Sequence, residues 1–151
     1  MGQSTDGQIC FGVMFEEDYE FPWSDEEYSD IEEWWKRENN YTPPFDVWTD
    51  EGEIIDGVTE KQVSDCFSHS REWSKRNPVP VVEVNYCSGD YPMIILATPS
   101  SLMSAKRGYP KEFNPKDLIV DSKEDQALKD FLNMHGLDSQ GARWWLSSYW
   151  W

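Results

Sequence analysis

Carboxylates and large aromatic side chains alternate through residues 15–38, FEEDYEFPWSDEEYSDIEEWWKRE, and no other segment is so biased toward residues that can do chemistry. Residues 1–57 contain 17 acidic side chains against one lysine and one arginine, so nearly all of the net charge of −16 lies in the first third of the chain. A field this one-sided favours a positively charged partner. The segment therefore predicts a binding surface.

We expect the carboxylates and the aromatic side chains of this segment to contact a partner protein together. A basic groove that binds phosphates also accepts carboxylates that recur on successive turns of a helix, and interleaved aromatic side chains supply apolar anchors. The expected anchors include Phe21 and Tyr28. The predicted partner-binding residues are Glu16, Glu17, Asp18, Tyr19, Glu20, Trp23, Asp25, Glu26, Asp30 and Glu33.

Two other interpretations of the same carboxylates stay open. Paired acids, such as Glu16 with Glu17 or Asp30 with Glu33, suit acid–base catalysis or a divalent-metal site in a small enzyme. Alternatively, the acids form a solvated face on an acidic domain that interacts through an aromatic patch. Because a solubilising role tolerates an even spread of charge, its concentration in one third of the chain favours a binding surface. We predict a non-enzymatic protein without a cofactor or a metal site.

Other candidate sites match their motifs poorly. Cys66 and His69 lie one turn apart on a predicted helix, but no second pair with metal-ligand spacing accompanies them. Residues 46–57 carry acids at short intervals, yet the glycine and the ligands of a calcium loop are misplaced. Three widely spaced cysteines, the lack of a long apolar run and the absence of a signal-peptide pattern predict a cytoplasmic protein that does not bind membranes. The negative charge predicts no direct binding of nucleic acid.

The periodicity of the sequence predicts one α+β domain over residues 1–151, with about three helices and a mainly antiparallel sheet. Strand patterns cover residues 8–15, 81–87, 91–98 and 142–151, and a small hairpin is expected over residues 45–55 with a left-handed Gly52. Helix starts are predicted at Ser24 with Glu27, at Thr59 with Gln62, and at Asp121.

The expected helix faces and the last strand complete this prediction. The apolar residues expected to pack are Tyr28, Ile31, Trp34 and Trp35 on the first helix, Val63, Cys66, Phe67, Ser70 and Trp73 on the second, and Leu128, Phe131 and Leu132 on the third. We expect Gly136 to end the third helix in a left-handed conformation. The aromatic C-terminal strand is expected either to be covered on both sides or to be covered on one side and to leave a binding patch on the other.

The blocks GQSTDGQICFGVMFEEDYEFPW, NYCSGDYPMIILATP and RWWLSSYWW together resemble a group of small acidic proteins encoded by tailed bacteriophages and their prophages. The resemblance covers most of the chain and brings no catalytic residues with it. Small acidic phage proteins include anti-restriction and anti-CRISPR inhibitors and nucleic-acid mimics. The resemblance therefore implies an accessory protein that acts in the host cytoplasm on a nucleic-acid-binding defence or replication component, and this implication is an analogy.

Overall fold

The computed structural model describes residues 5–24, 30–88, 92–137 and 141–150. The chain forms two compact units: the sheet unit comprises residues 1–22 and 80–151, and the helical unit comprises residues 23–79. Three helices and a five-stranded, mostly antiparallel sheet confirm the predicted α+β class. That all 151 residues form one domain stays a prediction.

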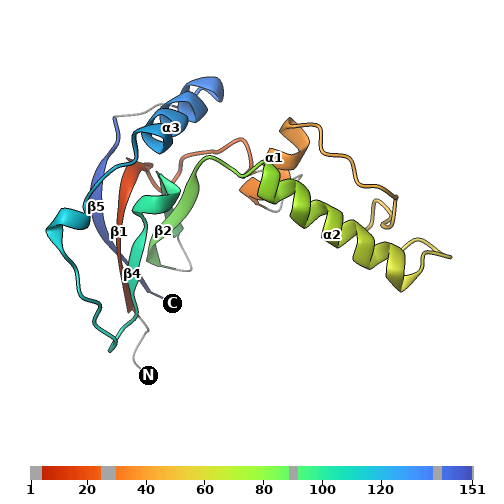
Figure 1. Ribbon diagram of the computed structural model, residues 1–151, viewed down its shortest axis with the longest axis horizontal. Coiled ribbons are helices and arrows are strands. Elements are labelled where there is room, and N and C mark those ends of the chain that lie inside the picture. Colours follow the sequence, from red (N-terminus) through yellow and green to blue (C-terminus); the bar gives the residue numbers. More distant parts are fainter. Residues whose placement is uncertain (1–4, 25–29, 89–91, 138–140, 151) are drawn as a thin grey trace. The chain divides into compact units, whose positions relative to one another are not determined.

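The sheet unit contains all five strands and one helix. Its elements are β1 (Thr5–Met14), β2 (Val82–Ser88), β3 (Pro92–Ala97), β4 (Met103–Ala105), α3 (Ser122–Met134) and β5 (Arg143–Trp150). The sheet order is β3-β2-β5-β1-β4, and β3 also pairs with β1. The strands β1, β3, β2 and β5 therefore form a closed ring, with β4 attached to β1. Figure 1 shows β5, β1 and β4 running alongside one another.

Strand β1 has more partners than any other strand of this sheet. It pairs with β5 over Thr5–Gly12, with β4 over Gly7–Ile9 and with β3 over Gly12–Met14, each time antiparallel. At Gly12, a Cβ atom would overlap the carbonyl oxygen of Leu96 and lie 2.6 Å from the Cα atom of Ala97. The close approach of β1 to β3 therefore requires a glycine at this position.

The interior of the strand ring holds one small apolar cluster. Cys10, Val84, Ile95 and Ala97 are buried there, and Val82, Tyr86 and Trp145 pack against them. The indole N–H of Trp145 donates a hydrogen bond to the carbonyl oxygen of Gly12 at 2.9 Å. Cys10 is fully buried in this core, and its burial raises the pKa of the thiol to about 11.

The predicted hairpin of β2 and β3 is confirmed, since these strands pair antiparallel from Val82 with Ala97 to Cys87 with Pro92. Its turn lies outside the described residues. Strand β5 lies between β2 and β1. On the face opposite Trp145, Trp144 contacts Phe11 with ring centroids 5.6 Å apart, whereas Leu146 is 80% exposed. The outer side of β5 is therefore covered only in part. Alternate residues of a strand face opposite ways, and only the side of Trp145 faces the interior of the ring.

Helix α3 matches its prediction closely. The Asp121 carboxylate accepts hydrogen bonds from the N–H groups of Lys123 and Glu124, and the side chains of Leu128, Phe131 and Leu132 are buried. Gly136 has a φ of +64°, and the N–H of Leu137 donates to the carbonyl oxygen of Leu132 at 2.9 Å. The left-handed glycine thus ends the helix as expected.

The helical unit contains α1 (Ile31–Glu38) and α2 (Glu60–Arg76). The predicted capping box of Thr59 and Gln62 is confirmed at the start of α2. A helix that runs on from Ser24 is wrong, because Asp30 is extended, with φ −169° and ψ 174°, and caps α1 by accepting a hydrogen bond from the N–H of Glu33. Aspartate caps helices as well as serine does, and it directly precedes the apolar face. Glu27, the partner predicted for Ser24, lies outside the described residues.

Aromatic side chains connect α1 to the residues that precede it and to the residue that follows α2. The rings of Trp23 and Trp34 lie 5.0 Å apart, and the indole N–H of Trp35 donates to the carbonyl oxygen of Asn77 beyond the end of α2. On α2, Cys66 is buried as predicted, but Phe67 is 56% exposed, so its expected burial is wrong. One helical face is too narrow to bury both of these consecutive residues, and it buries the cysteine.

The predicted small hairpin over residues 45–55 is present. Trp48 and Ile54 form an antiparallel bridge, and Gly52 adopts the expected left-handed conformation with a φ of +79°. Val47, between the exposed side chains of the first arm, is buried. The hairpin therefore has one anchored side chain and several that face solvent.

Candidate functional site

The acidic loop, which we define as residues 16–20, follows β1 directly. The carboxylates of Glu16, Glu17, Asp18 and Glu20 are all exposed. The N–H of Tyr19 donates to the carbonyl oxygen of Glu16 at 3.1 Å and closes a turn. None of these carboxylates forms an ion pair with a lysine or an arginine within the part of the chain that the structure describes. The loop therefore presents four negative charges to solvent.

Three aromatic rings hold the acidic loop in place. The ring centroids of Phe15, Tyr19 and Phe21 are separated by 4.5, 4.8 and 4.9 Å, and Phe15 and Phe21 are buried. We call this cluster the aromatic trio. The N–H of Phe15 donates to the carbonyl oxygen of Ile94 at 3.0 Å. The hydroxyl of Tyr86 donates to the carbonyl oxygen of Phe15 at 3.1 Å. The trio thus fixes the backbone of the loop against the sheet.

The surroundings of Tyr86, which include Glu16 of the acidic loop, raise the pKa of its phenol. Burial raises this pKa, and electrostatic interactions with Cys87 and Glu16 raise it further. The phenol therefore stays protonated and keeps donating its hydrogen bond to Phe15 throughout the physiological pH range. The anchor of the loop does not depend on pH in that range.

The other predicted partner-binding residues belong to the helical unit, and several have different roles. Trp23 is only 4% exposed and packs against Trp34, so it belongs to the core. Asp30 caps α1, and Glu33 forms an ion pair with Lys36 at 2.6 Å. Phe21, another expected anchor, is buried in the aromatic trio. Asp25, Glu26 and the expected anchor Tyr28 lie outside the described residues.

The predicted carboxylates therefore do not all lie on successive turns of a single helix. Asp30 lies before the first turn of α1, and the structure brings Glu16, Glu17, Asp18, Tyr19 and Glu20 together in one loop instead. The sequence contains the signal for this loop: a strand that ends at Phe15, followed by acids spaced by aromatic residues. The helical periodicity of the residues that follow favoured a helix as the binding element instead.

The described residues give little support to a metal site. No group of three or more histidine, cysteine, aspartate or glutamate side chains among them is placed to hold a metal ion. The Cys66 thiol donates to the carbonyl oxygen of Phe45 at 3.6 Å, whereas Nδ1 of His69 lies 3.3 Å from the Tyr41 hydroxyl. These two side chains thus have separate partners within the helical unit.

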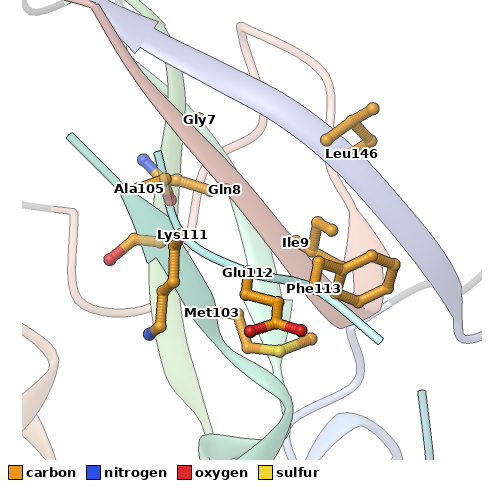
Figure 2. Close-up of a pocket in the computed structure, with 10 residues that line it drawn as sticks. Gly7, Gln8, Ile9, Met103, Ala105, Lys111, Glu112, Phe113 and Leu146 are labelled. Carbon is orange, nitrogen blue, oxygen red and sulfur yellow. The ribbon is translucent and has the colours of Figure 1, made fainter. Parts of the chain in front are cut away.

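A small pocket on the outer face of the sheet was not predicted from the sequence. Its volume is about 170 Å³, and Figure 2 shows residues 111–113 crossing β1 and β4 beside it. The lining residues are Gly7, Gln8, Ile9, Met103, Ser104, Ala105, Lys111, Glu112, Phe113 and Leu146. Ile9 pairs with both Met103 and Leu146 across the sheet, which explains why apolar side chains gather there. Only the strand register reveals this grouping.

No known protein family, curated protein or solved structure matches the chain. Among the described residues, no helix is both long enough and apolar enough to cross a lipid bilayer.

Proposed function

We propose that this chain is a non-enzymatic accessory protein of a bacteriophage that binds and inhibits a host protein in the cytoplasm. The target is a nucleic-acid-binding component of host defence or replication, and the acidic surface of this protein competes with nucleic acid for the target's basic groove. One observation carries the proposal: the acidic loop holds four exposed carboxylates, without ion-pair partners among the described residues, on a backbone anchored by the aromatic trio.

The physical argument is electrostatic competition by a preorganised loop. A fixed backbone loses little conformational entropy on binding, so more of the charge–charge attraction is expressed as affinity. This protein and nucleic acid are both negatively charged, so they compete for the same lysine and arginine side chains of the target, and steered association is fast at low salt. Binding should therefore weaken as the salt concentration rises.

The test is affinity capture from a bacterial host lysate with the wild-type chain and two charge-matched variants. The loop variant carries Glu16→Gln, Glu17→Gln, Asp18→Asn and Glu20→Gln, and the control variant carries Glu38→Gln, Glu112→Gln, Asp117→Asn and Asp130→Asn. All eight residues are exposed, so both variants should keep the melting temperature of the wild type within a few degrees. We expect the wild type and the control to retain a nucleic-acid-binding protein that salt elutes.

The loop variant should lose that protein. Equal capture by the loop variant and the control would contradict the proposal, as would a captured partner that high salt does not elute. A stoichiometric divalent metal found by elemental analysis of the purified protein would instead favour the alternative of a carboxylate metal site.

A further inference from the structure

The helical unit exposes an apolar patch, which we define as Phe45, Trp48, Ile54 and Phe67. Their side chains are 43%, 40%, 56% and 56% exposed, respectively. Trp48 pairs with Ile54 across the small hairpin, and the rings of Trp48 and Phe67 meet edge to face with centroids 5.4 Å apart. The carbonyl oxygen of Phe45 accepts the hydrogen bond of Cys66, the residue before Phe67. The hairpin and the middle of α2 thus meet through the Trp48–Phe67 contact and the Phe45–Cys66 hydrogen bond, and both expose apolar side chains there.

Backbone hydrogen bonds hold this patch in a fixed conformation. The N–H of Thr49 donates to the carbonyl oxygen of Glu53 at 2.8 Å, and the N–H of Ile55 donates to that of Val47 at 3.1 Å. Val47 is 1% exposed and anchors the hairpin. Large apolar side chains that stay exposed on a fixed scaffold are typical of interaction sites, because their exposure to water does not stabilise the unbound protein.

Carboxylates surround the patch in the sequence and remain exposed in the structure. Residues 45–67 contain seven acids and a single base, Lys61, and Arg71 lies one turn beyond Phe67 on α2. The acids, which we call the acidic rim, are Asp46, Asp50, Glu51, Glu53, Asp56, Glu60 and Asp65, and all are exposed. None of them forms an ion pair with a lysine or an arginine in the described ranges.

We propose that the apolar patch docks a cationic amphipathic segment of a partner protein, whose apolar side chains cover the patch while its lysines and arginines meet the acidic rim. Charge complementarity selects this occupant. A second copy of the chain would bring one acidic rim against another in a protein of net charge −16, and an uncharged peptide would desolvate carboxylates without pairing them. The patch belongs to the helical unit, whereas the acidic loop belongs to the sheet unit, so this inference goes beyond the function proposed above.

The test is a selection from a random peptide display library on the full-length protein. We expect the selected peptides to combine apolar residues with several lysines or arginines. Their affinity should fall at least tenfold for the patch variant, Ile54→Ser with Phe67→Ser, and stay unchanged for the control variant, Ile119→Ser with Met134→Ser. The control residues are 73% and 75% exposed, so both variants replace side chains that face solvent.

A third variant keeps the test decisive if the patch variant melts early. Asp50→Asn, Glu51→Gln and Glu53→Gln change only rim charge, and we expect them to weaken peptide binding and reduce its salt dependence. The loop variant, which tests the proposed function, should bind the selected peptides like the wild type. Selected peptides without net positive charge, or peptides that bind the rim variant as tightly as the wild type, would overturn the inference.

Discussion

Gly12 shows how one residue determines whether the strand ring can close. Any side chain there would collide with the backbone of Leu96 and Ala97 in β3. We expect Gly12→Ala to lower the free energy of unfolding by at least about 1–3 kcal/mol, because the obstructing atoms are backbone and cannot rotate away. Chemical denaturation monitored by circular dichroism measures this change.

Gly7, in the same strand, is the matched control for Gly12. A Cβ atom added there meets no atom within 4 Å. Gly7→Ala should therefore change the stability by less than about 1 kcal/mol, and in the stabilising direction, because alanine loses less backbone entropy on folding. Similar losses for the two variants would show that β1 and β3 do not approach as closely as described.

The acidic residues show that one residue type can have several roles within a short segment. Glu16 faces solvent beside the aromatic trio, Asp30 caps a helix, and Glu33 pairs with Lys36. Composition treats these carboxylates as equal, but only those without a structural role are available to a partner at no cost in stability. The proposed function therefore rests on the acidic loop.

Among the elements, β5 contributes most to the closure of the sheet. It pairs with eight residues of β1, from Thr5 to Gly12, and also reaches β2. Deleting residues 144–151 should therefore unfold the sheet unit, since the loss of a packed tryptophan alone costs about 3–5 kcal/mol out of a typical 5–15 kcal/mol. A truncated chain that still melts as sharply as the full-length protein in calorimetry would contradict this expectation.

Two point variants separate the packed side of β5 from its open side. Trp145 packs against the interior cluster and donates to the carbonyl oxygen of Gly12, whereas Leu146 is 80% exposed. We expect Trp145→Ala to cost about 3 kcal/mol or more and Leu146→Ala about 0.5 kcal/mol or less. Equal losses would mean that Leu146 is packed as tightly as Trp145.

At the scale of the whole molecule, charge dominates the expected behaviour. The two units carry net charges of −7 and −9, so both repel phosphates on average. We expect no gel shift of DNA or RNA at moderate salt, and a melting temperature that rises as added salt screens repulsion between carboxylates. A clear shift of nucleic acid would overturn this prediction and remove the basis for mimicry.

The sequence by itself determined the elements that depend on local signals. The residue patterns marked β1, β2, β3 and β5 but not the short β4, the capping box of Thr59 and Gln62 marked the start of α2, and Gly136 marked the end of α3. These signals act over a few residues, so they need no tertiary context. The acidic bias of the first third is equally a property of the sequence, and so is the prediction of a binding surface.

Only the tertiary structure decided which of these residues are available. Trp23 is buried and Phe67 is exposed, although both are aromatic residues in amphipathic surroundings. The closed ring, the requirement for Gly12 and the open side of Leu146 follow from strand order and register. Strand pairs join residues far apart in the chain. A shift of one residue in the register would move every side chain of the strand to the opposite face of the sheet, so no local pattern specifies which face is exposed.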